Sequence, residues 1–446
     1  MYVTLRDRAV GDDAAARKFW RRPPGATKQR VATTVVLFGV VSMFTDISSE
    51  SVNAILPLYL TSILGFSSLA YGFIDGIYQG VSAVVRILGG WISDRTDHPK
   101  WVAFIGYAIS AASRVFLLPA TSFVAITSII TGDRLGKGIR TAPRDAVIAA
   151  ATPPQRLARA YGVHRTLDTL GALVGPLMAF AILLVVPGDY HAVFVAALAF
   201  AVIGVLFLLL TVPDLRPRRQ AEEAPRQAEE AQPAAPAGER APARVTLRLL
   251  TTSAQRRVVI AAGLLALLTI GDGFLYLELT YRDTLATKYF PLLYVGTNFA
   301  YLLLALPLGQ LADRIGRVRM YLAGHVLLLL AYVCAVGPLA GAVSSIACLF
   351  LLGGYYAATD GILPAISASL APPSVRTSAI ATAQTSVAAA RFVSSLGFGL
   401  MWTELGRQPA LLWVGAALLL ALPVALVILR NVEPSPDTAE FVGDTN

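Results

Sequence analysis

The chain has 446 residues, of which 55% are hydrophobic and only 15% are charged, and its mean hydropathy is +0.62. A typical soluble protein carries about 25% charged residues, so this composition excludes a large soluble protein. The net charge of +9 could indicate a nucleic-acid partner, but the basic residues stand between apolar runs and form no aromatic–basic RNA-binding motif. Anionic lipid headgroups and cytoplasmic loops explain these basic residues better.

Apolar stretches of about 20 residues predict membrane-spanning helices. The sequence contains twelve, at 31–63, 69–92, 101–119, 121–150, 158–186, 190–212, 257–284, 289–312, 318–338, 340–370, 375–403 and 409–430. The basic leader at 1–30 has no apolar run or cleavage site of the kind found in a signal peptide.

A polar segment at 214–255, rich in Pro, Ala, Glu and Arg, separates the sixth span from the seventh. It cannot bury enough apolar surface to fold alone, so we expect a disordered linker. The predicted fold is an all-α integral membrane protein with two pseudo-symmetric bundles of six helices, at 31–213 and 256–430, and a tail at 431–446. Basic residues crowd the leader, the linker and alternate loops, which predicts that the linker and both termini are cytoplasmic.

Charged residues interrupt the fourth span in the stretch "GDRLGKGIRTAPRD" at 132–145. Asp133, Lys137, Arg140 and Arg144 are spaced four, three and four apart, which places them on one helical face, with Arg134 to one side. Each charge at the bilayer centre costs at least about 2.5–3.5 kcal/mol. We therefore expect these side chains to face a cavity or a partner of opposite charge.

The first span supplies acidic partners, because Asp46, Glu50 and Asn53 also share one face. At 1.5 Å of rise per residue, Asp46 lies about 22 Å along the helix from the start of the span, near mid-membrane. Two interpretations remain open. Asp46 or Glu50 could carry a transported proton and alternate with Arg134 or Lys137. Alternatively, the charges could form a static lattice that only holds the spans together.

Further ionisable residues lie in other spans. Arg165 and Asp168 are three apart in the fifth span and could be a structural pair or part of the coupling machinery. Asp272 and Asp360, in the seventh and tenth spans, could face a cationic substrate or its proton. Because most of these residues lie in the first half, we expect the chemistry to be concentrated there. We find no metal spacing, phosphate loop or nucleophile–base motif, so neither a metal, a cofactor nor an enzyme is expected.

Several short motifs recur in the two halves, and with them the chain resembles the major facilitator superfamily. The family's loop pattern of Gly, three residues, Asp and Arg is matched by Gly309, Asp313 and Arg314, and in the first half by Gly90, Asp94 and Arg95, although Asp97 replaces a later glycine. In the fourth span Arg134 and Gly138 match the family's Arg–Gly–Gly pattern, but Arg140 replaces the last glycine. In the fifth span an antiporter-like pattern is matched by Gly162, Gly171, Gly175 and Pro176.

The resemblance implies a twelve-helix secondary transporter whose spans one, four, seven and ten line a central cavity. It also implies a gating role for the loop motif, whereas the glycine row fits either antiport or plain helix packing. We expect proton-coupled export of a small molecule by alternating access, by a monomer in a bacterial-type plasma (inner) membrane. The alternative is a proton-coupled importer of an anionic solute. The identity of the substrate is left open.

Overall fold

The computed structural model describes residues 32–96, 98–152, 156–214, 253–337, 341–371, 376–430 and 432. The predicted leader and nearly all of the predicted linker and tail lie outside these residues. Within them every regular element is a helix, as predicted for the fold class. Helices suit a chain in lipid, because each one satisfies its own backbone hydrogen bonds.

The first half contains six spanning segments, and the first of these is broken. It consists of α1 (Thr33–Asn53), α2 (Leu56–Leu58) and a π-helical stretch, η1 (Tyr59–Ile63). The other five are single helices: α3 (Ser68–Thr96), α4 (Pro99–Leu117), α5 (Phe123–Ala150), α6 (Leu157–Val185) and α7 (Tyr190–Thr211).

The second half repeats this plan, with two broken segments. The seventh consists of α10 (Ser253–Ala266) and α11 (Asp272–Arg282), and the tenth of α14 (Ala342–Thr359) and α15 (Ile362–Ser369). A short 3₁₀-helix, η3 (Thr287–Tyr289), leads into α12. The remaining helices are α12 (Phe290–Ile315), α13 (Arg317–Val336), α16 (Arg376–Leu405) and α17 (Arg407–Leu429).

By length and composition alone, seven of these described segments are apolar enough to cross a membrane. Helix α5 is not among them, because its second half carries the charged stretch. The lipid-facing surface is nevertheless apolar: Val185, Leu210 and Leu420 expose 80%, 79% and 71% of their surface. Such side chains need a hydrocarbon environment, so the protein is a multi-pass membrane protein.

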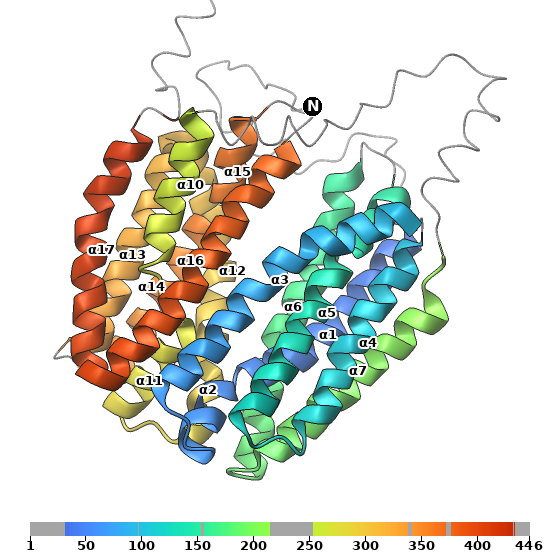
Figure 1. Ribbon diagram of the computed structural model, residues 1–446, viewed down its shortest axis with the longest axis horizontal. Helices are drawn as coiled ribbons and strands as arrows, with labels where there is room; N and C mark the ends of the chain where they lie inside the picture. The colour runs from blue at the N-terminus through green and yellow to red at the C-terminus, as the bar shows by residue number, and fades with distance from the viewer. Residues whose placement is uncertain are drawn as a thin grey trace, which may run out of the picture.

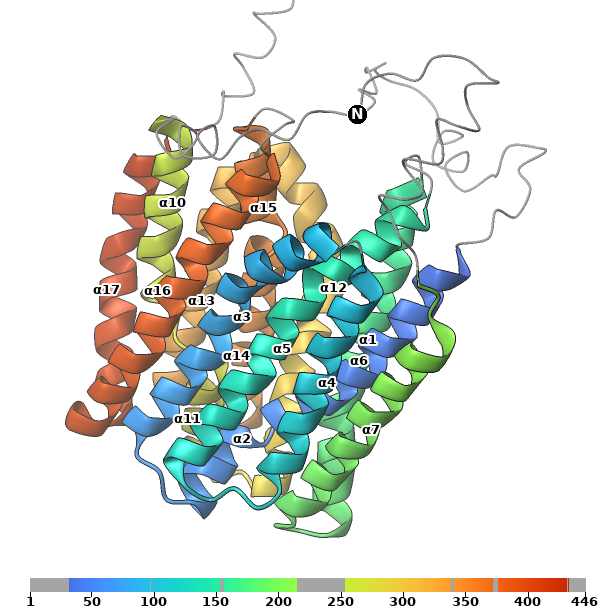
Figure 2. The same ribbon diagram turned by 45° about the vertical axis from the view of Figure 1, so that its right-hand side comes forward.

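The two halves lie side by side in Figure 1, with α1–α7 in blue to green and α10–α17 in yellow to red. We call the side where α7 ends and α10 begins the linker side, and the opposite side the far side. Helix α3 crosses from one half to the other and packs along α16, as Figure 2 also shows. Gly72 and Gly76 of α3 permit this approach, because a Cβ on either would crowd the backbone of Ser395 or Phe392.

Candidate functional site

A cavity of 370 Å³ lies between the two halves. Side chains from α1, α3, α5 and α6 line it on one side, and side chains from α11, α12, α14 and α16 line it on the other. Its charged residues are Asp46, Glu50, Lys137, Arg165, Asp168, Asp272, Asp360 and Arg391. The structure therefore brings seven of the ten predicted coupling residues to one cavity, all except Asp133, Arg134 and Arg140.

Two carboxyl groups of this cavity meet where α1 packs against α6. Asp46 of α1 and Asp168 of α6 both line the cavity there, and their carboxyl groups interact electrostatically. Two ionised carboxylates repel each other, so their proximity favours a proton on one of the two groups. Asp168 also lies 3.3 Å from Nη1 of Arg165 and 3.8 Å from Nη1 of Arg144.

The antiporter-like glycine pattern explains how α1 and α6 come so close. A Cβ on Gly171 would lie 2.5 Å from the carbonyl oxygen of Met43, and a Cβ on Gly175 would lie 2.8 Å from that of Ile47. Gly162 has open space around it. Two of the three glycines thus allow the backbone contact that brings Asp46 next to Asp168.

The charged stretch of α5 is divided between two environments. Lys137 lines the cavity, whereas Asp133, Arg134 and Arg140 are buried inside the first bundle. Asp133 lies 3.1 Å from Nη2 of Arg114 and also pairs with its neighbour Arg134. The charged residues that helical spacing places on one face of α5 therefore do not all line the cavity.

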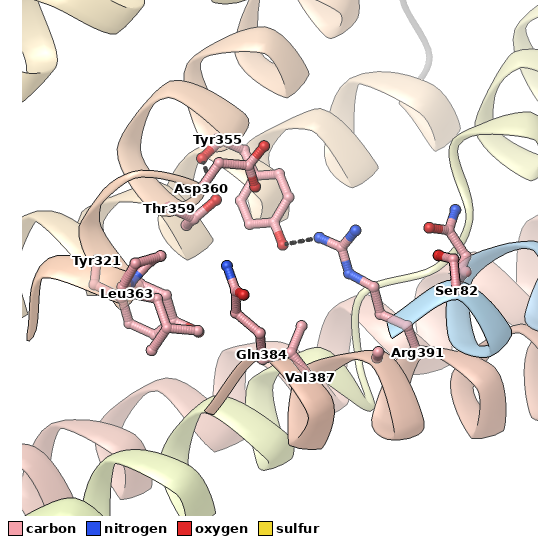
Figure 3. Close-up of a pocket in the computed structure, with 12 residues that line it drawn as sticks. Ser82, Tyr321, Tyr355, Thr359, Asp360, Leu363, Gln384, Val387 and Arg391 are labelled. Carbon is pink, nitrogen blue, oxygen red and sulfur yellow. Dashed lines mark hydrogen bonds between the residues drawn. The ribbon is translucent and has the colours of Figure 1, made fainter. Parts of the chain in front are cut away.

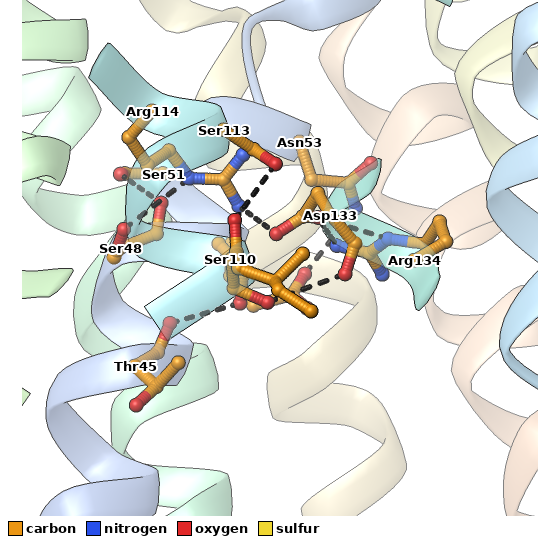
Figure 4. A network of polar contacts seen from close by, with 12 residues as sticks. Thr45, Ser48, Ser51, Asn53, Ser110, Ser113, Arg114, Asp133 and Arg134 are labelled. Atoms are coloured by element: carbon orange, nitrogen blue, oxygen red, sulfur yellow. Dashed lines mark hydrogen bonds and ion pairs between the residues drawn. The ribbon is translucent and has the colours of Figure 1, made fainter. Parts of the chain in front are cut away.

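Hydrogen bonds extend this buried pair into a network that joins α1, α4 and α5 (Figure 4). Arg114 donates to Ser48 over 3.4 Å, and Arg140 donates to Ser110 over 2.9 Å. The guanidinium of Arg134 stacks 3.8 Å from the ring centroid of Tyr78. Because Asp133 pairs with two arginines and Arg140 is hydrogen-bonded in the interior, this geometry fits a lattice that holds the bundle together.

The wall of the cavity formed by the second half contains a tyrosine-rich charged cluster. Tyr356 donates a hydrogen bond of 2.6 Å to Asp272, and Arg391 donates one of 3.0 Å to Tyr355. A second chamber of 220 Å³ shares Gln79, Asp360 and Arg391 with the cavity (Figure 3). It continues past Ser82 and Gln384 towards the linker side.

The cavity is closed on the far side by contacts between the halves. Ser395 of α16 donates a hydrogen bond of 2.6 Å to Asp75 of α3. A Cβ on Gly271, in the break between α10 and α11, would collide with the Asp75 carboxylate. Nearby, the ring centroid of Phe274 lies 4.7 Å from the ring centroid of Tyr71 and 4.9 Å from that of Phe398.

The predicted gating motifs lie at the linker-side ends of the helices. Gly316 joins α12 to α13 with φ at 98°, a conformation that favours glycine. Asp313 makes an exposed ion pair of 3.5 Å with Arg317, and Arg314 is exposed. Arg95 is also exposed, whereas the side-chain environments of Gly90 and Asp94 are outside what the structure describes. A gating role for these residues stays a prediction.

Some cavity residues were not predicted as site residues. Gln79 and Asn298 are amides inside spans, and their polarity in an apolar context was a usable signal. Arg391 lies inside the eleventh predicted span, where a charge in an apolar context was a further usable signal. Tyr301 carried no signal, because a tyrosine in a span is equally common in an interfacial belt.

Comparisons with known proteins agree with this geometry. The family model for the Major Facilitator Superfamily matches residues 37–295 and 284–444, so the chain belongs to this superfamily. It is a membrane transporter of that kind, and the predicted family and fold class are confirmed.

Two relatives are similar to this chain in sequence. An uncharacterized MFS-type transporter of Methanocaldococcus jannaschii is 27% identical over 84% of this chain and 89% of its own length. A probable nitrate/nitrite transporter, NarK2, of Mycobacterium tuberculosis is 27% identical over only 35% of this chain and 39% of its own.

Solved structures show the same fold. The nucleoside transporter NupG superposes with a TM-score of 0.74 at 15% identity, covering 89% of this chain and all of that one. A POT family transporter in complex with 5-aminolevulinic acid superposes with a TM-score of 0.71 at 13% identity, covering 90% and 96%. At these identities the likeness concerns the fold alone.

Proposed function

We propose that this chain exports a small molecule in exchange for protons, by alternating access, without changing its substrate chemically. The observation that supports the proposal is the pairing of two acidic residues, Asp46 and Asp168, at the wall of the central cavity, and in the proposed cycle their carboxyl groups share a proton. In this proposal the pair holds a proton while α1 packs against α6, and it can lose the proton when the two helices separate. Protonation and conformation are then coupled.

The neighbours of the pair suggest where the proton resides. Arg165 and Arg144 both approach Asp168 and stabilise its ionised form. The shared proton then belongs to Asp46. Lys137 lines the same cavity and can balance the charge of Asp46 once the proton has left.

The structure's open and closed sides fit one half of a transport cycle. The far side is closed by Asp75 and Ser395, while the second chamber extends towards the linker side. With the linker side in the cytoplasm, as the positive-inside bias predicts, this is an inward-facing state of a transporter in an inner (plasma) membrane. The proposal needs a single chain and no cofactor.

A specific observation favours the second candidate, a proton-coupled importer of an anionic solute. Lys137 and Arg391 line the cavity from opposite halves, and neither has a carboxylate within 4.0 Å among the described residues. Such cations could hold an anion between the halves.

Transport in liposomes distinguishes the two candidates. Purified protein is reconstituted, a pH gradient of either sign is imposed, and uptake of labelled nucleosides, amino acids, dipeptides and nitrate is followed together with internal pH. Antiport predicts accumulation only with an acidic interior, with matching proton efflux that is lost in Asp46→Asn. Uptake only with an acidic exterior would establish the importer instead. Glu404→Gln, an exposed carboxylate outside the cavity, is the control.

A further inference from the structure

The charges of the central cavity restrict what it can accept. Five carboxyl groups and three cationic groups line it. Counting the one proton that the proposed function assigns to Asp46 and Asp168, and every other group as ionised, these groups carry a net charge of −1. A simple anion would add to this negative charge in a site of low dielectric, which is costly. The overall charge of the cavity therefore disfavours a substrate with only an anionic group.

Arg391 argues against the opposite extreme, a simple cation. Its side chain lines both chambers. Among the residues that the structure describes, its guanidinium donates a hydrogen bond to the hydroxyl of Tyr355 alone, and its buried Nε has no hydrogen-bond partner. Among the described residues no carboxylate comes within ion-pair distance of it. A buried guanidinium inside a membrane needs an acceptor of its donors, and a cationic substrate would offer none.

Asp360 lines both chambers together with Arg391 and carries the opposite charge. It caps α14 and is exposed. Within the described part of the chain, its carboxylate makes no ion pair or hydrogen bond. Arg391 and Asp360 thus line the same two chambers, and among the described residues neither forms an ion pair.

From these charges we infer that the substrate is a small amphoteric molecule, with its anionic group held by Arg391 and its cationic group by Asp360. The inference rests on the transport function proposed above. A molecule carrying both charges satisfies the donors of Arg391 and the acceptors of Asp360, and leaves the net charge of the cavity unchanged. An amine and a carboxylate on one short carbon skeleton fit a junction between chambers of 370 and 220 Å³.

Ligand-dependent thermal stability of the purified full-length protein tests this. The probes are the standard amino acids and short dipeptides, each compared with the amine that lacks its carboxylate and the acid that lacks its amine. Because a ligand that binds the native state raises the unfolding temperature, we expect at least one amphoteric compound to stabilise the protein. Its matched amine and acid should do so at least roughly tenfold more weakly.

Variants then locate the two charges. Arg391→Gln and Asp360→Asn should each weaken binding of the stabilising compound by at least roughly tenfold. Arg391→Lys keeps the charge but loses the forked donor geometry, and should weaken binding too; it is the substitute if Arg391→Gln does not fold. Arg257→Gln and Glu404→Gln change exposed residues outside both chambers and should bind normally.

Several outcomes would overturn the inference: stabilisation by amines alone, by acids alone or by no class of probe, or full affinity in the Arg391 variants. The readout is binding, so it does not depend on proton coupling. If no amphoteric compound binds, the transport result in liposomes is unaffected. If antiport is not found in liposomes, the binding assay can still be interpreted.

Discussion

Ser395 of α16 donates a hydrogen bond of 2.6 Å to the carboxylate of Asp75 in α3, and so joins residues that are 320 positions apart in the sequence. The bond crosses from one half of the transporter to the other on the closed side of the cavity. Alternating access requires that such a contact break whenever the far side opens.

We predict that Ser395→Ala shifts the conformational equilibrium towards a state that is open on the far side. A hydrogen bond to a charged group is worth about 1.5–3 kcal/mol, so the open population should rise by roughly tenfold or more. Spin labels at the exposed positions Ser67 and Glu404, in a background with Cys334 and Cys348 replaced, would report longer distances.

Ser344→Ala is the matched control, because Ser344 bonds the carbonyl of Cys334 within one half and spans no moving boundary. If Ser395→Ala and Ser344→Ala give the same distance distributions, Asp75 and Ser395 do not hold the far side closed.

We predict that Gly171→Ala and Gly175→Ala destabilise the protein, because each new methyl group would press on the backbone of α1. Overpacking of this kind costs about 1–3 kcal/mol. Thermal unfolding in detergent measures the loss. Gly162→Ala, in the same helix but with open space around it, should be neutral or slightly stabilising. Equal behaviour of the three variants would refute the packing explanation.

We predict that Asp133→Asn is strongly destabilising, by about 3–5 kcal/mol, because it leaves Arg114 and Arg134 buried without a counter-charge. The amount of folded protein that elutes as a single species from size-exclusion chromatography reports this. The exposed carboxylate variant Glu404→Gln controls for loss of charge alone. A well-folded Asp133→Asn variant that instead lost proton coupling would restore Asp133 to the coupling group.

The spans were predictable because hydrocarbon demands long apolar helices, and the twelve predicted ranges correspond to the helical segments found. The breaks inside them were not predicted. The seventh predicted span ran without interruption, yet α10 ends at Ala266 and α11 begins at Asp272. The reason lies in tertiary packing: Gly271 must make room for Asp75, a residue of another helix.

The sequence predicted which residues line the cavity better than it predicted which residues pair with each other. Helical spacing placed Asp46 and Glu50 on one face, and both line the cavity. Spacing also placed Asp133 on the face of Lys137, but the partner that holds Asp133 is Arg114, on a different helix. Which carboxylate meets which guanidinium depends on how helices pack, and periodicity along one helix carries no such information.

The central claim, that Asp46 holds a proton shared with Asp168, is tested most directly by infrared spectroscopy of the reconstituted protein. At neutral pH we predict a carbonyl band of a protonated carboxyl group that shifts in deuterium oxide, is absent from Asp46→Asn and persists in Glu404→Gln. A spectrum of Asp46→Asn that keeps the whole band would contradict the account.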